Sequence, residues 1–334
     1  MRIRSSGPRL ALRRVTACLL LSASVAALGC QDFRECRVPE GSTAQLPARL
    51  SDTGLYDDIV TGTLASSVRE FTPRFPLWSD GAEKQRFVAL PEGTRIDSSD
   101  MDDWQFPEGT KLWKQFTRDG VRVETRLEQK IGPEPADWAL VGYVWDQDET
   151  DAVRTEGGEP DARGTSHDVP RAADCLGCHG GRKSRVLGFS AVQLSAAGQL
   201  ARLIDEGVMS DPPDRELEIP GSAEQIAGLG YLHANCGHCH NQIRPDVEGP
   251  RCYDPQRDFE LVLRVSDLRS VKTSSAVRTG VGHVIDVGDV DDSKILKRMR
   301  ARDPDLPSMP PLGTELVDEV GVAAVRAFVR SLGE

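Results

Sequence analysis

Two short segments of the chain repeat the pattern Cys-x-x-Cys-His. The first is Cys175-Leu-Gly-Cys178-His179, and the second closes the stretch YLHANCGHCH at residues 231–240. On a helical turn, residues i and i+3 share a face and i+4 lies beside them, so both sulfurs and the imidazole can meet one planar ring. The pattern is typical of covalent haem attachment, in which two thiols add to the vinyl groups and the histidine ligates the iron. The sequence therefore predicts two covalently bound c-type haems, one on Cys175, Cys178 and His179, the other on Cys236, Cys239 and His240.

Chance does not explain these motifs. A chain with 8 Cys and 6 His in 334 residues would hold about 0.003 of them after shuffling. A zinc site built from both cysteine pairs is one alternative, but the gap between the pairs exceeds the usual spacing and the histidines stay unexplained. A redox dithiol is the other, and it needs a βαβ context that the sequence does not show.

The sixth position of each iron is a separate question. Met309 lies in the Pro-rich segment SMPPLG and is predicted to ligate the iron opposite His240, which would raise the potential of the second haem. The alternative for Met309 is a buried residue that fills a gap in the core. The first haem has no comparable segment. An empty sixth position is one interpretation there, and the candidate ligands are His167, Met209, His233 and His283.

The first 29 residues predict a signal peptide. They hold five arginines and no acidic residue, and the apolar run Val15–Gly29 is short for a membrane span. Ala27-Leu28-Gly29-Cys30 is similar to a bacterial lipobox, which predicts a lipid on Cys30 and attachment to a membrane; plain cleavage near Ala26 is the alternative. The chain is thus expected to be exported, either to the periplasm or as an anchored lipoprotein of a bacterial cell envelope.

Charge and the remaining cysteines restrict the partners. The net charge is −11, and without the five arginines of the signal it becomes −16. Such a chain is not expected to bind nucleic acid, and redox partner proteins of the envelope are the predicted partners. Four cysteines remain after haem attachment; Cys18 leaves with the signal and Cys30 is the predicted lipid site, so Cys36 and Cys252 are left and are predicted to form a disulfide.

Residues 71–150 predict a β-rich region with an antiparallel sheet. All five tryptophans lie before residue 150, and apolar residues alternate with polar ones over 121–127. Further strands are expected at 86–90, 111–117 and 139–145, with a tight turn at Asp119-Gly120. The polar group Asp80, Glu83, Lys84 and Arg86 is interpreted as a salt-bridged surface.

The second half predicts helices around the haem motifs. Apolar spacing over 191–208 indicates one amphipathic helix, and Ser222-Ala-Glu-Gln225 is a capping box that begins a helix leading to Cys236. Asp291 and Asp292 are expected to cap a helix over 293–300. An apolar stripe over 320–332 predicts a terminal helix that crosses the one before the second motif. Basic residues just after the first motif either neutralise haem propionates or form a solvated loop: Arg182, Lys183 and Arg185.

The order of helix, Cys-x-x-Cys-His, Met-Pro loop and terminal helix over 222–334 resembles the class I cytochrome c fold. Residues 70–334 more broadly resemble a family of exported bacterial dihaem c-type cytochromes. The segments that carry this resemblance are LWSDGAEKQRFVALPEG, WQFPEGTKLWKQF, VETRL, YLHANCGHCH and SMPPLG, together with the first haem motif. The resemblance implies covalent haem and electron transfer, and it implies no particular substrate.

The expected fold is therefore multidomain, an antiparallel β-rich domain followed by a mainly α, cytochrome c-like haem region. The predicted boundaries are 1–29 signal, 30–70 tether, 71–150 β-rich domain, 151–170 linker, 171–221 first haem segment and 222–334 second haem domain. The leading hypothesis is an electron carrier rather than an enzyme. The alternatives are a dihaem peroxidase-like oxidoreductase with the first haem open to a small molecule, and a redox-linked binding module that uses the β-rich domain.

Overall fold

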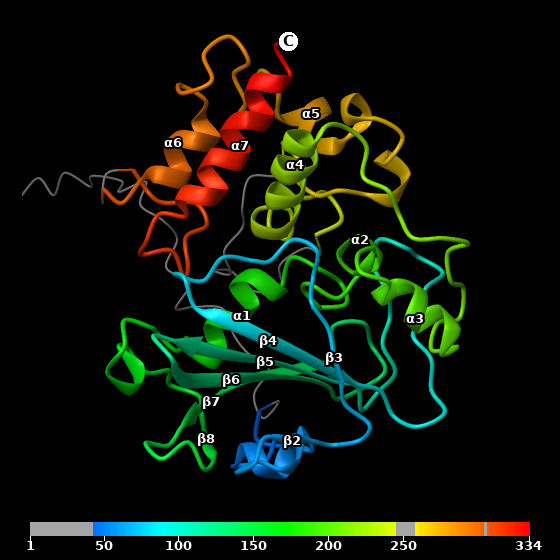
Figure 1. Cartoon of the computed structure of the whole chain (residues 1–334), viewed down its shortest axis with the longest axis vertical. Helices are drawn as coiled ribbons and strands as arrows, with labels where there is room; N and C mark the ends of the chain where they lie inside the picture. Colours follow the sequence, from blue (N-terminus) through cyan, green and yellow to red (C-terminus); the bar gives the residue numbers. More distant parts are fainter. Residues whose placement is uncertain (1–42, 245–257, 304–305) are drawn as a thin grey trace, which may run out of the picture. The chain divides into compact units, whose positions relative to one another are not determined.

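A six-stranded antiparallel sheet dominates the first half of the protein (Figure 1). The computed structural model describes residues 43–244, 258–303 and 306–334. Each strand pairs with the next one along the chain, and the strands are β3 Arg69–Glu70, β4 Glu83–Ala89, β5 Lys111–Arg118, β6 Val121–Lys130, β7 Trp138–Trp145 and β8 Ala152–Thr155. The predicted antiparallel β-rich region is thereby confirmed, and β4 to β7 match the four expected strands.

The turn between β5 and β6 follows from its sequence. Asp119 has a φ of 52° and Gly120 a φ of 79°, and Arg118 pairs directly with Val121. Two successive residues with positive φ make the two-residue turn whose twist suits a hairpin, and Asp-Gly is a preferred pair for it. The expected tight turn at this position is confirmed.

The two faces of the sheet pack against different parts of the chain. On one face, Trp113, Leu127 and Tyr143 pack against Leu50 and Leu55 of the preceding segment. That segment contains a 3-10 helix at Leu50–Thr53 and a small sheet of β1 Tyr56–Asp58 and β2 Thr63–Leu64. The opposite face is apolar at one end, where Val88, Leu112 and Leu140 pack with Phe189, Leu194 and Leu200. The rest of that face is polar.

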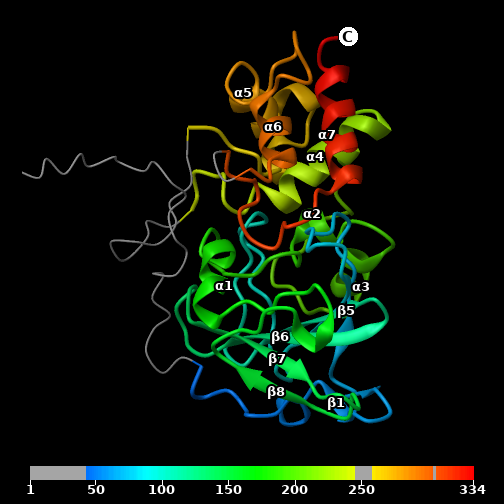
Figure 2. The same cartoon turned by 90° about the vertical axis from the view of Figure 1, so that its left-hand side faces the viewer.

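In the described part of the chain, seven α-helices follow the sheet: α1 Ala172–His179, α2 Ala191–Leu194, α3 Gln199–Asp205, α4 Ala223–Asn235, α5 Ser275–Gly280, α6 Lys294–Arg300 and α7 Glu319–Ser331. Short 3-10 helices lie at Ala162–Gly164, Val265–Asp267 and Val271–Thr273. Figures 1 and 2 both show α1 between the sheet and the group formed by α4 to α7. None of the helices in the described ranges is long and apolar enough to cross a membrane.

Helices α4 and α7 form the centre of the second core. Ser222 caps α4: its hydroxyl accepts the Gln225 N–H, and its own N–H donates to the Gln225 side chain. This confirms the predicted capping box. Gly228 of α4 lies against Phe328 of α7, where a Cβ on the glycine would stand 2.2 Å from the Phe328 Cβ. The predicted crossing of the terminal helix over α4 is therefore confirmed.

Two expected helix features are wrong in detail. Residues 191–208 form the two helices α2 and α3, because Ala197 and Gly198 between them have φ values of 54° and 70° and so break the helical path. Helix α6 is preceded by Ser293, whose hydroxyl bonds Asp286, so the expected cap by Asp291 or Asp292 is not formed.

Two of the predicted segments contain regular structure that the sequence did not predict. Residues 43–70, expected in a tether, contain the first small sheet, and 151–170, expected as a linker, contain β8 and a 3-10 helix. All described residues belong to one compact unit. The division into separate domains stays a prediction. The signal at 1–29, Cys30, Cys36 and Cys252 lie outside the described residues.

Candidate haem-binding site

Helix α1 carries the whole of the first motif. It begins after Pro170, and Asp174 accepts bonds from the backbone N–H and the guanidinium of Arg171, which closes the first turn. Cys175, Cys178 and His179 occupy the remaining turns. The helix ends where Gly180 donates its N–H to the Leu176 carbonyl. The helical spacing predicted for this motif is thus present.

A hydrogen bond to the backbone fixes the tautomer of His179. Its Nδ1 lies 2.6 Å from the carbonyl oxygen of Arg185, and because that oxygen only accepts, Nδ1 carries the proton. The lone pair is then on Nε2, which lies 3.6 Å from Glu128. Burial lowers the pKa of His179 to about 4, so the ring is neutral at neutral pH. A neutral imidazole whose other nitrogen bonds a backbone carbonyl is typical of metal ligation.

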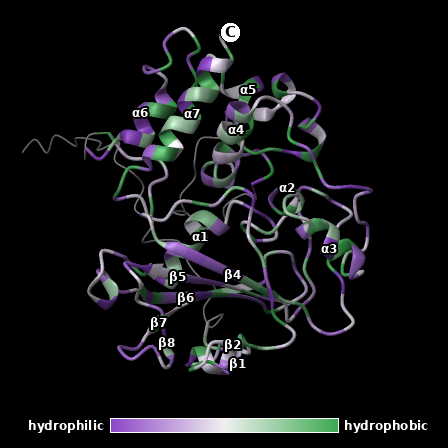
Figure 3. Ribbon diagram, in the orientation of Figure 1, coloured by the Kyte–Doolittle hydropathy of each residue, from purple (hydrophilic) through white to green (hydrophobic). Residues whose placement is uncertain are grey.

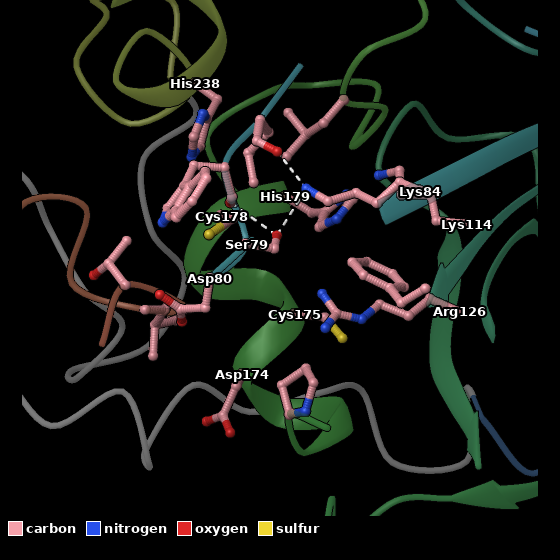
Figure 4. A pocket seen from close by; sticks show the side chains of 18 of the residues that line it. Ser79, Asp80, Lys84, Lys114, Arg126, Asp174, Cys175, Cys178, His179 and His238 are labelled. Carbon is pink, nitrogen blue, oxygen red and sulfur yellow. Dashed lines mark hydrogen bonds between the residues drawn. The ribbon is translucent and has the colours of Figure 1, made fainter. Parts of the chain in front are cut away.

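The first motif opens onto a cavity of ≈ 1010 Å³. This volume lies at the upper end of the range of about 300–1,000 Å³ that cofactor pockets occupy. Cys175, Cys178 and His179 line one side, and β4, β5 and β6 supply Lys84, Arg86, Lys114, Phe116 and Arg126 on the other (Figure 4). Apolar residues complete the lining, among them Leu77, Trp78, Val186, Leu187, Pro311 and Leu312. Two thiols, a neutral imidazole, apolar walls and cations fit a covalently attached haem.

The second motif is packed differently. It follows the end of α4, where Cys236 donates its N–H to Leu232, and the residues Cys236, Cys239 and His240 are only 8%, 8% and 9% exposed. His240 stacks on Phe259 with ring centroids 4.5 Å apart. None of the three motif residues lines the cavity. The sequence indicated this motif as the better-defined haem site, but here its three residues are covered by protein, and a haem on them stays a prediction.

The two motifs are in direct contact although 61 residues separate them in the sequence. The Sγ of Cys239 lies 3.7 Å from the carbonyl oxygen of Gly177. Gly181 lies so close to His238 that a Cβ on the glycine would stand 1.7 Å from the His238 carbonyl oxygen. The buried Asn241 amide donates to the carbonyls of Gly181 and His238 and so joins both segments. The segments that carry the first and second motifs therefore pack directly against each other.

The surroundings of the four thiols do not favour a redox dithiol or a zinc site. Burial raises the pKa of Cys175 to about 12 and that of Cys236 to about 12, and it also raises the pKa of Cys178 and Cys239. A reactive dithiol needs a lowered pKa, so this environment does not favour the redox-dithiol interpretation. Within the described residues, no three His, Cys, Asp or Glu side chains are grouped to hold a metal ion. The four-cysteine zinc arrangement is not assembled.

Two of the predicted sixth-ligand candidates line the cavity. His167 is buried, and its Nε2 lies 2.7 Å from Oε1 of Glu124. His233 accepts the Leu263 N–H at its Nδ1, 3.0 Å away, which places the proton of its neutral ring on Nε2. Both rings would have to give up these bonds to present Nε2 to iron.

The other two candidates lie elsewhere. Met209 is buried in the core between the sheet and α3, and it does not line the cavity. His283 lies beside Asp258 and against the edge of Phe259, so it is nearer to the second motif than to the first. Neither is brought to the first haem motif.

The loop that carries Met309 borders the cavity of the first motif. Ser308, Pro311, Leu312 and Gly313 all line it, and the Met309 N–H donates to the Arg298 carbonyl at the end of α6. The peptide between Met309 and Pro310 is cis. Ligation by Met309 opposite His240 stays a prediction.

Several residues that line the cavity were not predicted from the sequence as site residues. His238, between the two cysteines of the second motif, lines the cavity of the first. Lys84 and Arg86, expected on a salt-bridged surface, also line it; Arg86 is buried, and neither forms a salt bridge with a described carboxylate. Figure 3 shows β4 as a hydrophilic strand. Lys84 and Arg86 are two residues apart in it and therefore share one face, and this spacing was the sequence signal that could have placed both in the site.

A buried carboxylate organises the polar wall. Glu124 is fully buried, pairs with the Arg126 guanidinium and bonds His167. Burial alone would raise the pKa of Glu124, but Arg126 and His167 together hold that pKa below its usual value. Arg126 and His167 both line the cavity and are held side by side through this carboxylate.

Comparison with protein-family models, with curated proteins and with solved structures found no match. The resemblance to dihaem cytochromes accordingly enters only as the basis of a proposal.

Proposed function

We propose that this protein is a dihaem c-type cytochrome that transfers electrons in a bacterial cell envelope. The observation that carries the proposal is the placement of Cys175, Cys178 and His179 on one wall of a cofactor-sized cavity, in contact with the second motif. Haem bound there supplies reversible one-electron chemistry, whose potential depends on its ligands and surroundings.

The chain's own residues prepare the first site. The thiols of α1 are the attachment points, and the Arg185 carbonyl keeps the His179 lone pair on Nε2. The apolar part of the lining can pack against the faces of the haem ring. Cys236, Cys239 and His240 are proposed to hold the second haem, and this requires the Phe259 ring to leave His240.

The contact between the motifs supports electron transfer. Asn241 and Gly181 hold the two attachment segments together, so cofactors bound to them are neighbours. The acidic charge of the chain favours basic surfaces on redox partner proteins. Export and a lipid on Cys30 belong to the same proposal, because haem of this type and the arginine-rich start of the chain both point to the envelope.

His238 is proposed as the sixth ligand of the first haem. It lines the cavity with His179, and the Ala234 backbone accepts a hydrogen bond from its ring. That bond leaves the other ring nitrogen available, whereas His167 and His233 use theirs for Glu124 and Leu263. Replacing His238 by Ala is expected to convert one haem to the high-spin form, while His167→Ala leaves both low-spin. The opposite result would exclude His238.

The proposal is tested by intact mass of the full chain, expressed in a host that attaches c-type haem. Two increments of about 616 Da are expected. Replacing Cys175 and Cys178 by Ser should remove one increment, and replacing Cys236 and Cys239 by Ser should remove the other. A wild-type chain without any increment contradicts the proposal, and a single increment that survives the second pair of changes contradicts the dihaem form.

A peroxidase-like oxidoreductase is the second candidate, and the polar wall favours it. Arg126 and His167, joined through Glu124, are groups that can hold a small polar molecule and move a proton. This function needs the first haem to keep an open position. Resonance Raman and EPR spectra of the purified protein decide: one high-spin haem supports this candidate, and two low-spin haems exclude it.

A further inference from the structure

Four cationic side chains share one face of the sheet at the cavity. The strand register pairs Arg86 with Lys114 and Lys114 with Arg126, and it pairs Lys84 with Phe116. Directly paired residues have Cβ atoms about 4.5–5.5 Å apart and point to the same side. All five residues line the cavity. Like charges at this spacing repel, so the wall needs compensating negative charge.

Two of the four cations, Arg126 and Lys114, are paired with carboxylates of the described residues. Arg126 pairs with Glu124, and Lys114 lies 2.7 Å from Glu128. Lys84 donates to the Ser79 hydroxyl (Figure 4) and to the Leu77 carbonyl, and Arg86 donates to the Lys84 carbonyl. Those acceptors are neutral. Among the described carboxylates, none lies within salt-bridge distance of Lys84 or Arg86.

Six acidic residues line other parts of the cavity, and none of them lies within salt-bridge distance of Lys84 or Arg86: Asp80, Glu159, Asp168, Asp174, Asp303 and Glu315. Asp174 pairs with Arg171 at the start of α1, and Asp80 accepts the Leu316 N–H. The wall of four cations and two carboxylates therefore keeps two positive charges. Burial lowers the pKa of Arg86 to about 10 and the pKa of Lys84 well below its usual range, and the neighbouring cations lower the Lys84 pKa further. Buried charges of this kind are stabilised when an anion pairs with them.

We propose that Lys84 and Arg86 bind the two propionate carboxylates of the haem attached to Cys175 and Cys178. This inference rests on the proposed function. The attachment thiols lie on α1 and the cations on the opposite wall of the same cavity, so one ligand can meet both (Figure 4). A guanidinium pairs with a carboxylate through two parallel bonds, and an ammonium through a point charge. Two carboxylates match the two uncompensated charges.

Arg182 is the less suited of the candidates. It lines the cavity too, but it donates to the Asp102 carbonyl and lies 3.9 Å from Asp103. Arg185 uses its guanidinium to bond the Gly180 carbonyl at the end of α1. Arg182 and Arg185 are thus used within the protein, whereas Lys84 and Arg86 on β4 have only neutral partners among the described residues.

The test compares Lys84→Met and Arg86→Met with Arg49→Gln in the full haem-loaded chain. Arg49 is 59% exposed in its side chain and pairs with Asp151, so its change controls for loss of one positive charge. Intact mass counts the haems, and redox titration measures the potential of the haem that disappears when Cys175 and Cys178 are replaced. A nearby cation favours the reduced iron, which carries one positive charge less. Each Met variant is expected to lower the equilibrium constant for reduction about tenfold, equal to about 59 mV for one electron.

Two further measurements distinguish loss of the propionate contact from misfolding of a variant and from binding of a free anion. Arg86→Lys keeps the charge and should return the potential close to the wild-type value, even if Arg86→Met does not fold. Inorganic phosphate added to the loaded wild-type chain should leave the haem spectrum unchanged, because the cations are occupied. A saturable spectral change that Arg86→Lys retains and Lys84→Met removes would assign the wall to a free anion and overturn the propionate assignment.

The result that overturns the inference while the proposed function stands is a loaded Lys84→Met or Arg86→Met chain with the potential of Arg49→Gln. A wild-type chain that carries no haem overturns the proposed function itself.

Discussion

The contact between the two haem motifs depends on the absence of a side chain at Gly181. A Cβ at this position would stand 1.7 Å from the His238 carbonyl oxygen and 2.8 Å from its carbon, whereas such contacts below 3.0 Å essentially never occur. In Gly181→Ala one of the segments must therefore move by about 1.3 Å, the difference between the first distance and that limit. Forcing a methyl group into a packed interior typically costs about 1–3 kcal/mol. We expect a loss of stability of that size.

Urea denaturation of the full chain measures this loss as a lower midpoint at an unchanged slope. Gly157→Ala is the matched control, because Gly157 lines the cavity of the first motif and has nothing within 4 Å of a new Cβ. The control is expected to stay within about 0.5 kcal/mol of the wild type. If Gly181→Ala were as stable as Gly157→Ala, the close packing of the first motif on His238 would be refuted.

Three further predictions concern separate residues. Met309→Ala should lower the potential of one haem and remove the near-infrared sulfur-to-iron absorbance; an unchanged potential together with retained absorbance would exclude Met309 as a ligand. Burial lowers the pKa of His233 to about 3 from 6.5, so the unfolded chain binds the proton first and stability falls as the pH drops through this interval. Relative to His233→Gln, the wild type should lose up to about 1.4 kcal/mol per pH unit between those values, and parallel stability curves would contradict the burial. A free-thiol count on the denatured protein should find Cys36 and Cys252 oxidised, and two reduced thiols would disprove their pairing.

The local features of the fold were predictable because they depend on neighbours in the chain. Alternation predicted β4 to β7, Asp119-Gly120 predicted the hairpin turn, and the Ser222 capping box predicted the start of α4. The break at Ala197-Gly198 was missed, since the apolar spacing on either side suits one helix and alanine seldom adopts positive φ.

The polar wall of the cavity was misread for a different reason. Lys84 and Arg86 occupy strand positions where charged residues are usually exposed, and sequence alone does not reveal what covers a strand face. Tertiary packing encloses them, because Lys84 bonds Leu77 and Ser79 and both residues line the same cavity as α1. Glu124 likewise has an ordinary sequence context, and its burial with Arg126 and His167 depends on residues from two distant segments.

By itself, the sequence determined the chemistry that this protein carries: two Cys-x-x-Cys-His motifs, whose spacing within one helical turn is a local property. Tertiary structure alone decided how the motifs relate, because contacts between segments 61 residues apart arise from the packing of the whole chain. It placed the first motif on an open cavity and covered the second with Phe259. It also brought His238 and the cations of β4 to the first motif, so the less distinctive motif in the sequence has the better-formed site.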